Sequence, residues 1–309
     1  MANMKYLFGI DGGGTSARLR IETVGGDLLF HAVGGSTNPH SNTLQAVESV
    51  LSDLFTKAYK SADLDPEDCV AGYAGSAGID RPYEKELFIT LLRKAGGFSC
   101  PVAAGNDVEP ALAGALGDTE GFLLISGTGS IAYARSRSGV SARAGGWGHL
   151  LGDEGSAYRI AFDALTRGLR SWENRDLPSG LLDAGLAFFG LREPSDLVSF
   201  VYGGIDKARI ARFAHVVGEY RDRGDLLAVE LFEIAGRELE NLVLSVDRRM
   251  GDRIRDKRLA LCGGFIEEDT ILRDRVSDRL HASAPGIAIV PAQADAATGA
   301  CLLARTLVS

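Results

Sequence analysis

The sequence is poor in the residues that build cross-links and metal centres. Its four cysteines stand alone in the chain with no CxxC pair, so a disulfide framework and a cysteine zinc site are both disfavoured. The five histidines show no metal-ligand spacing. Isolated thiols are typical of a reducing compartment, so we expect a cytoplasmic protein with free thiols at Cys69, Cys100, Cys262 and Cys301.

Long apolar runs and clusters of basic residues are also missing. No stretch approaches the roughly 20 apolar residues of a membrane span, so we expect no membrane partner. The net charge is −8 and the pI is about 5.2, which disfavours nucleic acid and anionic lipid as partners. What is present is a chain of 309 residues, 45% of them hydrophobic, which is long enough for two domains that each bury a core.

Glycines gather in a short stretch near the start of the chain, Asp11-Gly12-Gly13-Gly14-Thr15-Ser16. An apolar run over residues 6–10 leads into this stretch and an alternating run over residues 17–21 leads out of it, which predicts two strands joined by a tight turn. Because glycine tolerates positive φ and lets a ligand approach the main chain, such a turn can present N–H groups to phosphate. An ordinary hairpin turn is the alternative interpretation.

A second copy of this pattern favours phosphate binding. Residues 121–125 predict a buried strand, Ser126-Gly127-Thr128-Gly129-Ser130 a turn of glycines and hydroxyl residues, and residues 131–135 another strand. A repeat of this length indicates a duplicated domain rather than a solenoid. Two such turns, one in each half, predict a nucleotide phosphate chain held from both sides.

The remaining pattern predicts an α/β protein whose second half is more helical. Before a boundary at Gly117-Asp118, three strands are followed by alternating helices and strands that end in a helix. The predicted helices are 43–60, 83–95, 108–116, 155–169, 177–189, 207–221, 226–250, 268–282 and 294–307, and the further strands are 70–74, 101–104, 259–262 and 287–290.

Two further features extend the predicted nucleotide site. Asp11 opens the first turn, where a carboxylate can hold Mg²⁺ through water molecules near the phosphates, although it can also simply cap the turn. Gly263-Gly264 follow a predicted strand and offer bare backbone to the nucleotide. The candidate ATP-binding residues are Gly12, Gly13, Gly14, Thr15, Ser16, Gly127, Thr128, Gly129, Gly263 and Gly264.

The most specific stretch is GGWGHLLGDEGSAY, residues 145–158. With Ser36-Thr37-Asn38, Asn106-Asp107 and the turn over residues 126–130, it makes the chain resemble the N-acetylglucosamine kinase group of the BadF/BadG/BcrA/BcrD ATPase family, within the actin–Hsp70–sugar kinase fold. The resemblance implies an α/β fold of two duplicated ribonuclease H-like domains around a central cleft. The implied lobes are residues 1–117 with 296–309, and residues 118–295.

The resemblance also implies site residues. In the resembling family the Asp that matches Asp107 follows a strand, faces the sugar 6-hydroxyl and acts as the general base. The residues alone leave a second interpretation open, because Asp107 directly precedes a helix and is a plausible N-cap. Ser76 ends a strand, where ligands of open α/β sheets bind. The predicted sugar-binding residues are Asn38, Ser76, Asn106, Asp107, Gly145, Gly146, Trp147 and Asp153.

Three of these residues have structural alternatives. Asn38 precedes Pro39, a pairing that marks turns whatever the function. Trp147 can belong to the core, and Asp153 can be only the N-cap of the following helix.

We therefore expect an ATP- and Mg²⁺-dependent kinase that phosphorylates O6 of N-acetylglucosamine, with a small-molecule sugar as its partner and a homodimer as its assembly. Glucosamine, N-acetylmuramate and glucose stay open as acceptors. A second hypothesis is an ATPase activator of a 2-hydroxyacyl-CoA dehydratase, which the isolated cysteines and the segment over residues 145–158 disfavour. A third is a filament or chaperone-like module on the same fold, for which the expected insertions are missing.

Overall fold

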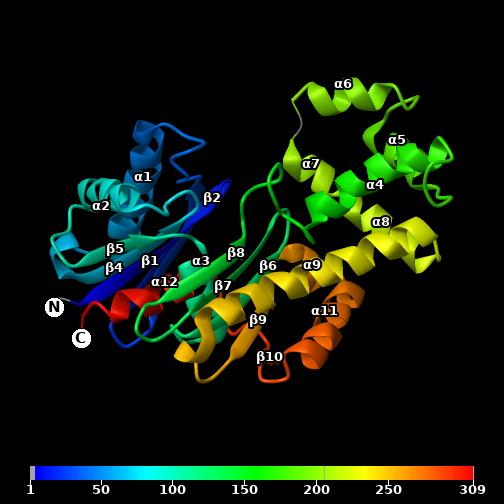
Figure 1. Ribbon diagram of the computed structural model, residues 1–309. Helices are drawn as coiled ribbons and strands as arrows, with labels where there is room; N and C mark the ends of the chain where they lie inside the picture. Colours follow the sequence, from blue (N-terminus) through cyan, green and yellow to red (C-terminus); the bar gives the residue numbers. More distant parts are fainter. Residues whose placement is uncertain (1–3, 205, 309) are drawn as a thin grey trace. The chain divides into compact units, whose positions relative to one another are not determined.

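The computed structural model describes residues 4–204 and 206–308. The chain divides into two compact units, shown with their elements in Figure 1. The first unit extends to Gly121 and is completed by the chain from Pro291 onward, and the second is Phe122–Val290. These boundaries lie a few residues from those that the sequence predicts at 117 and 296.

The first unit is built on a five-stranded mixed sheet with strand order β3-β2-β1-β4-β5. Strands β1, β2 and β3 are antiparallel neighbours, and β1, β4 and β5 run parallel. All apolar residues of β1 are buried, which explains its continuous apolar run. The strands are β1 (Tyr6–Gly12), β2 (Ser16–Thr23), β3 (Leu28–Gly35), β4 (Cys69–Ser76) and β5 (Val102–Gly105).

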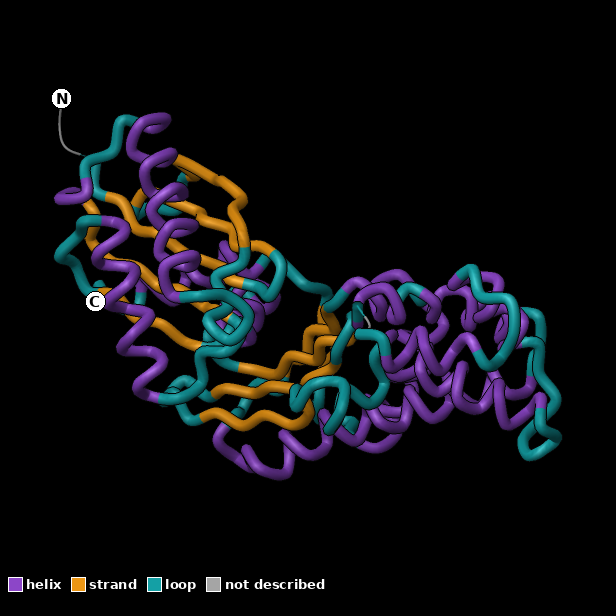
Figure 2. The backbone as a smooth tube through the Cα atoms, turned by 90° about the horizontal axis from the view of Figure 1, so that it is seen from above, coloured by secondary structure: helices purple, strands orange, loops and turns teal. Residues whose placement is uncertain are grey.

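Two hydrophobic clusters cover this sheet. One contains Phe8, Phe55 and Phe98, whose rings pack together beneath the helices α1 and α2. The other joins Leu7 to Cys301 and involves α3 and the C-terminal helix α12, which returns to the first sheet (Figure 2). The helices are α1 (Leu44–Ala62), α2 (Pro82–Gly96), α3 (Val108–Leu116) and α12 (Ala296–Arg305), with a 3₁₀ turn over Pro66–Asp68.

The parallel pairing of β4 with β5 has one effect that the sequence does not reveal. It brings the thiol of Cys69 to 3.4 Å from the thiol of Cys100, and both are free. The cysteines are isolated in the sequence, but these two are neighbours in the fold.

The second unit repeats the plan with strand order β10-β9-β6-β7-β8. Strands β6, β9 and β10 run parallel, and β7 pairs with β8 in antiparallel fashion. The strands are β6 (Gly121–Ser126), β7 (Ser130–Arg135), β8 (Ser141–Gly145), β9 (Arg258–Cys262) and β10 (Ala288–Val290).

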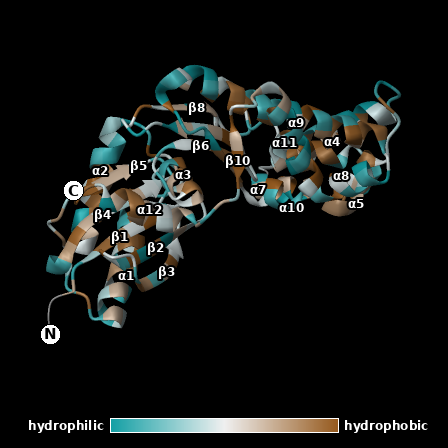
Figure 3. Cartoon of the chain, turned by 90° about the horizontal axis from the view of Figure 1, so that it is seen from below, coloured by the Kyte–Doolittle hydropathy of each residue, from teal (hydrophilic) through white to brown (hydrophobic). Residues whose placement is uncertain are grey.

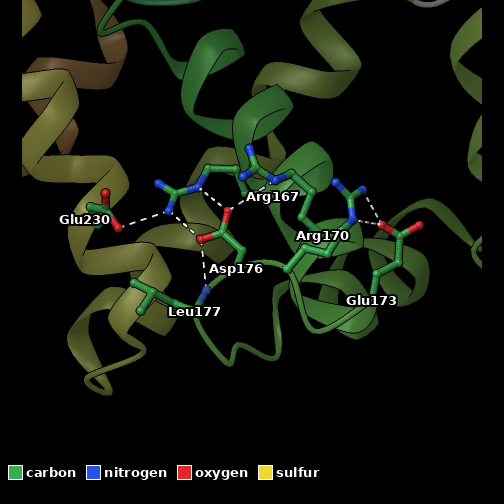
Figure 4. Close-up of polar contacts among 7 residues, drawn as sticks. Arg167, Arg170, Glu173, Asp176, Leu177 and Glu230 are labelled. Carbon is green, nitrogen blue, oxygen red and sulfur yellow. Dashed lines mark hydrogen bonds and ion pairs between the residues drawn. The ribbon is translucent and has the colours of Figure 1, made fainter.

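Helices make up most of the second unit, and their apolar faces share one large core (Figure 3). An ion-pair network links neighbouring segments of this bundle (Figure 4). Arg167 of α4 pairs with Asp176 in the loop that follows α4, and also with Glu230 of α9. The helices are α4 (Ala157–Trp172), α5 (Leu181–Phe189), α6 (Asp196–Tyr202), α7 (Lys207–Ala211), α8 (Phe213–Asp222), α9 (Leu226–Met250), α10 (Gly264–Glu268) and α11 (Thr270–Ser283), with a 3₁₀ turn over Gly251–Arg253.

Two predicted helices differ from this structure. The predicted helix 177–189 begins only at Leu181, because the carboxylate of Asp225 accepts hydrogen bonds from Ser179 and Gly180 and holds them in a loop. The predicted helix 207–221 is two helices separated at Arg212. Strand β8 and helix α6 were not predicted. In the described part of the chain no helix is long and apolar enough to cross a membrane.

Candidate active site

The first glycine turn joins β1 to β2 as the sequence predicts. The N–H of Gly13 donates to the carbonyl of Ser16 at 2.8 Å and closes the turn. Gly14 and Thr15 are exposed at its tip, while Gly12 is buried at its base. The tip therefore offers accessible backbone, as a phosphate-binding turn requires.

Hydroxyl side chains from segments distant in the sequence pack against this turn. A Cβ atom on Gly12 would lie 2.2 Å from Oγ1 of Thr37 and 2.8 Å from Oγ of Ser76, so only glycine fits there. The hydroxyl of Ser36 donates to the carbonyl of Gly13, and the N–H of Ala77 donates to that of Gly12. The first turn and the loop that carries Asn38 are therefore joined by hydrogen bonds into one rigidly packed region.

Ser76 is fully buried beneath the first turn, and its hydroxyl forms a hydrogen bond with the hydroxyl of Thr37 at 3.1 Å. This packing accounts for Ser76 without a sugar contact, so we do not include it among the proposed sugar ligands.

Asn38 forms the turn that the sequence offers as one of its two interpretations. Its Oδ1 atom accepts from the N–H of His40 at 2.8 Å, which forms an Asx turn. This bond uses the carbonyl end of the carboxamide and leaves its NH₂ group to donate to a ligand.

Asp107 follows β5, and the structure separates its two interpretations. Its side chain makes no capping hydrogen bond to α3. The cap comes from Asn106, whose Oδ1 accepts from the N–H of Val108 at 3.2 Å while its Nδ2 donates to Asp80 at 2.9 Å. Asp107 therefore occupies the N-cap position of α3, but the capping side chain is that of Asn106.

Burial and neighbouring carboxylates raise the pKa of Asp107 to about 6, with Asp11 the largest charge contribution and Asp80 a smaller one. The pKa of Asp11 is also raised by burial, against the opposing effect of Arg18 at 3.4 Å. Asp11 and Asp107 thus form a partly buried acidic pair at the ends of β1 and β5, where a cation would be favourable.

The second turn joins β6 to β7 and is hydrogen-bonded both within itself and to a distant segment. Its Gly127 N–H donates to the carbonyl of Gly129 at 2.9 Å. The end of the sequence segment 145–158 runs along this turn and bonds to it repeatedly. The bonds are Ser126 Oγ to Gly155 O, Ala157 N to Gly127 O, Ser130 Oγ to Glu154 O and Ser130 N to an Asp153 carboxylate oxygen.

Gly263 brings the third predicted backbone segment to the same turn. It has φ +105, and a Cβ atom there would lie 2.6 Å from the carbonyl oxygen of Ser126. Gly264 then begins α10. A hollow beside α10 and α8 is lined by His215, Gly218 and Asp269.

The glycine loop after β8 presents apolar side chains. Gly145 and Gly146 both have positive φ, and Gly146 N–H donates to the carbonyl of Ser130 at 2.9 Å. Trp147 is 61% exposed beneath the guanidinium of Arg143, so the interpretation of Trp147 as a core residue is wrong. Leu150 and Leu151 are also exposed.

Lys207 is not singled out by the sequence, yet its Nζ atom lies 3.3 Å from a carboxylate oxygen of Asp153. No sequence signal joins these residues, because the contact depends on how α7 packs against α4. Among the described residues no cluster of three or more metal-ligating side chains is present, so a metal ion at Asp11 would be held largely through water.

Known proteins resemble this chain over nearly its whole length. An N-acetylmuramic acid/N-acetylglucosamine kinase of Clostridium acetobutylicum is 35% identical, covering 98% of this chain and 99% of the relative. An N-acetyl-D-glucosamine kinase of Dictyostelium discoideum is 30% identical, covering 97% and 98%. A ROK family glucokinase structure from Streptomyces griseus, in complex with glucose and AMPPNP, shares the fold with a TM-score of 0.60 at 18% identity, covering 97% and 99%. Residues 8–304 match the family model for the BadF/BadG/BcrA/BcrD ATPases, and the chain belongs to this family.

Proposed function

We propose that the protein is an ATP-dependent sugar kinase that phosphorylates an amino sugar, N-acetylglucosamine, at O6. One observation carries the proposal: each glycine turn is hydrogen-bonded to a segment that the family resemblance assigns to the sugar. The first turn bonds to the loop of Asn38, and the second bonds to the segment that ends at Asp153. The relatives named above are kinases of the same class of acceptor.

The two turns and Gly263-Gly264 are proposed to bind ATP, with the phosphates on the exposed backbone. The hollow lined by His215 and Asp269 is the proposed place for the adenosine, because it lies beside α10. Asp11 is proposed to hold Mg²⁺ through water, and the partly buried pair of Asp11 and Asp107 favours a cation there. When bound, Mg²⁺ would neutralise charge on the transferred phosphoryl group.

In the proposed reaction O6 of the sugar attacks the γ-phosphorus. The O6–P bond forms while the bond from phosphorus to the β,γ-bridging oxygen breaks, and ADP leaves with that electron pair. The carboxylate of Asp107 accepts the proton of the 6-hydroxyl. Because Asp107 makes no capping hydrogen bond to α3, its carboxylate stays available for this role.

The exposed side chains of Trp147, Leu150 and Leu151 favour an acetamido sugar over a free amine. An acetyl methyl group gains from apolar contact, whereas an ammonium group would have to lose its hydration. N-acetylmuramate, glucosamine and glucose are the alternative acceptors, and a glucosamine kinase of Vibrio cholerae is 26% identical to this chain. A homodimer in the cytoplasm completes the proposal, supported by the family resemblance and by the free cysteines.

The deciding experiment is an assay of ADP release with N-acetylglucosamine, N-acetylmuramate, N-acetylmannosamine, glucosamine and glucose. The expected result is the highest kcat/KM for N-acetylglucosamine and a product phosphorylated at O6 by NMR. Transfer to none of these sugars would refute the kinase assignment. Iron bound to the purified protein would instead support a dehydratase activator.

A further inference from the structure

Asp153 has an unusual backbone for a buried acidic residue. Its φ is +64, which non-glycine residues rarely adopt, and the residue is almost fully enclosed at 3% exposure. Such a conformation is unfavourable by about 1–3 kcal/mol, so the surrounding structure must hold it in place.

The carboxylate of Asp153 lies against the second glycine turn. One oxygen accepts from the N–H of Ser130 at 3.3 Å. A Cβ atom on Gly129 would lie 2.9–3.1 Å from the carboxylate, so the turn closes tightly over this side chain. Asp153 therefore connects the segment of residues 145–153 directly to the proposed phosphate-binding turn.

A cation faces the other oxygen. The Nζ atom of Lys207, the first residue of α7, lies 3.3 Å from Oδ2 of Asp153. The lysine side chain is 38% exposed, whereas the aspartate side chain is 4% exposed. A buried carboxylate requires such a partner, because an unpaired buried charge is strongly unfavourable.

We propose that Lys207 is a positioning residue for the sugar site. It holds the Asp153 carboxylate in a fixed orientation, so that one oxygen bonds to the phosphate-binding turn and the other can accept hydroxyl hydrogens of the sugar. This inference rests on the proposed kinase function. A direct contact of Lys207 with the ATP phosphates is the competing role, and the experiment below separates the two.

The experiment compares Lys207→Met and Lys207→Arg with wild type. Turnover is measured against varied N-acetylglucosamine and varied ATP, and sugar binding is measured by calorimetry. In Lys207→Met we expect the sugar KM and Kd to rise about tenfold, the loss typical of one charged hydrogen-bond partner. The ATP KM and kcat stay within threefold, and Lys207→Arg restores the sugar KM to within threefold of wild type.

Two controls exclude a general loss of structure. Lys257→Met removes a lysine of the same unit that pairs with Asp247 at 2.7 Å, and it should leave the sugar KM unchanged. In a double-mutant cycle, Lys207→Met should add nothing to Asp153→Asn, because both substitutions remove the same pair. Melting temperatures show that each variant is folded.

The outcomes distinguish this inference from the proposed function. An active wild type with an unchanged sugar KM in Lys207→Met overturns the role of Lys207 alone. A larger rise in the ATP KM than in the sugar KM overturns it in favour of phosphate contact. A wild type that binds the sugar without transferring phosphate refutes the proposed function, and calorimetry still tests Lys207. A wild type that binds none of the sugars overturns both.

Discussion

At the scale of single residues, Asp107 is the proposed general base. Its carboxylate is partly buried, makes no capping bond to α3 and interacts electrostatically with Asp11. We expect Asp107→Asn to fold normally and to lose roughly 10²–10⁴ in kcat, as removal of a general base does. Steady-state kinetics checks this, with the exposed Asp53→Asn as the matched control. A kcat near that of wild type would rule out Asp107 as the base.

The same substitution should stabilise the protein. Burial raises the pKa of Asp107 from 3.8 to about 6, so the folded state binds its proton more tightly than the unfolded state. The group therefore stabilises the fold below about pH 4, and this contribution is lost as the pH rises through 6. At pH 8, Asp107→Asn removes a partly buried charge that is unfavourable by about 1–3 kcal/mol. We expect a higher melting temperature for the variant at pH 8 and a smaller difference at pH 4.5.

The raised pKa also predicts the pH dependence of wild-type activity. Only the ionised carboxylate accepts a proton, so kcat/KM for the sugar should fall about tenfold per pH unit below an apparent pKa near 6. A pH–rate profile at saturating ATP tests this, with enzyme stability checked at each pH. A flat profile down to pH 4.5 would mean that Asp107 does not titrate in the rate-limiting step.

The sequence indicates which residues belong to the candidate site better than it indicates which hydrogen bonds each of them makes. Asn106 and Asp107 are adjacent polar residues before a helix, and either can cap it. Which one does so depends on the first residue of α3, and sequence patterns locate helix ends only to within one or two residues. Likewise Ser76 ends β4 as predicted, but the hydroxyl of Thr37 that pairs with its hydroxyl comes from a distant loop.

At the scale of elements, the glycines of the first turn differ in what requires them. Gly12 is required by the packing of the fold, whereas Gly14 is proposed to be required by the ligand. A Cβ atom on Gly12 meets buried Thr37 and Ser76, whereas a Cβ atom on Gly14 meets nothing within 4 Å. We expect Gly12→Ala to destabilise the protein by about 1–3 kcal/mol through overpacking. Gly14→Ala should keep the wild-type melting temperature yet bind ADP more weakly, because its methyl group would occupy the proposed phosphate position.

Denaturant unfolding and ADP calorimetry on both variants check this prediction. Equal stability of the two variants would show that the turn relaxes around Gly12, and unchanged ADP binding by Gly14→Ala would place the phosphates elsewhere.

The elements that the sequence predicts best are the ones repeated in it. The strand–turn–strand units at Asp11 and at Ser126 have strong apolar periodicity and glycines, which are local signals. The region between residues 177 and 221 was predicted less well, because its breaks depend on tertiary contacts such as that of Asp225 with Gly180. The spacing of apolar residues along the sequence does not indicate those tertiary contacts.

At the scale of the whole molecule, the two units differ in how the chain completes them. The second unit is one continuous segment with its own core. The first needs the C-terminal residues, because α12 supplies Ala300, Cys301 and Leu303 to the cluster around Leu7. A Cβ atom on Gly299 would lie 2.0 Å from the carbonyl oxygen of Pro110, so α12 packs against α3 almost backbone to backbone.

Truncation should therefore affect the units unequally. A chain that ends at Val290 loses α12 and exposes the face of the first sheet around Leu7, a loss comparable with the roughly 5–15 kcal/mol that stabilises a whole domain. We expect β1 and β4 to lose their protection from hydrogen exchange in that chain, while β6 and α9 keep theirs. A fragment over residues 122–290 should unfold cooperatively on its own. A chain that ends at Leu307 keeps α12 and serves as the control. Full protection of β1 without α12 would show that the first unit folds from its N-terminal segment alone.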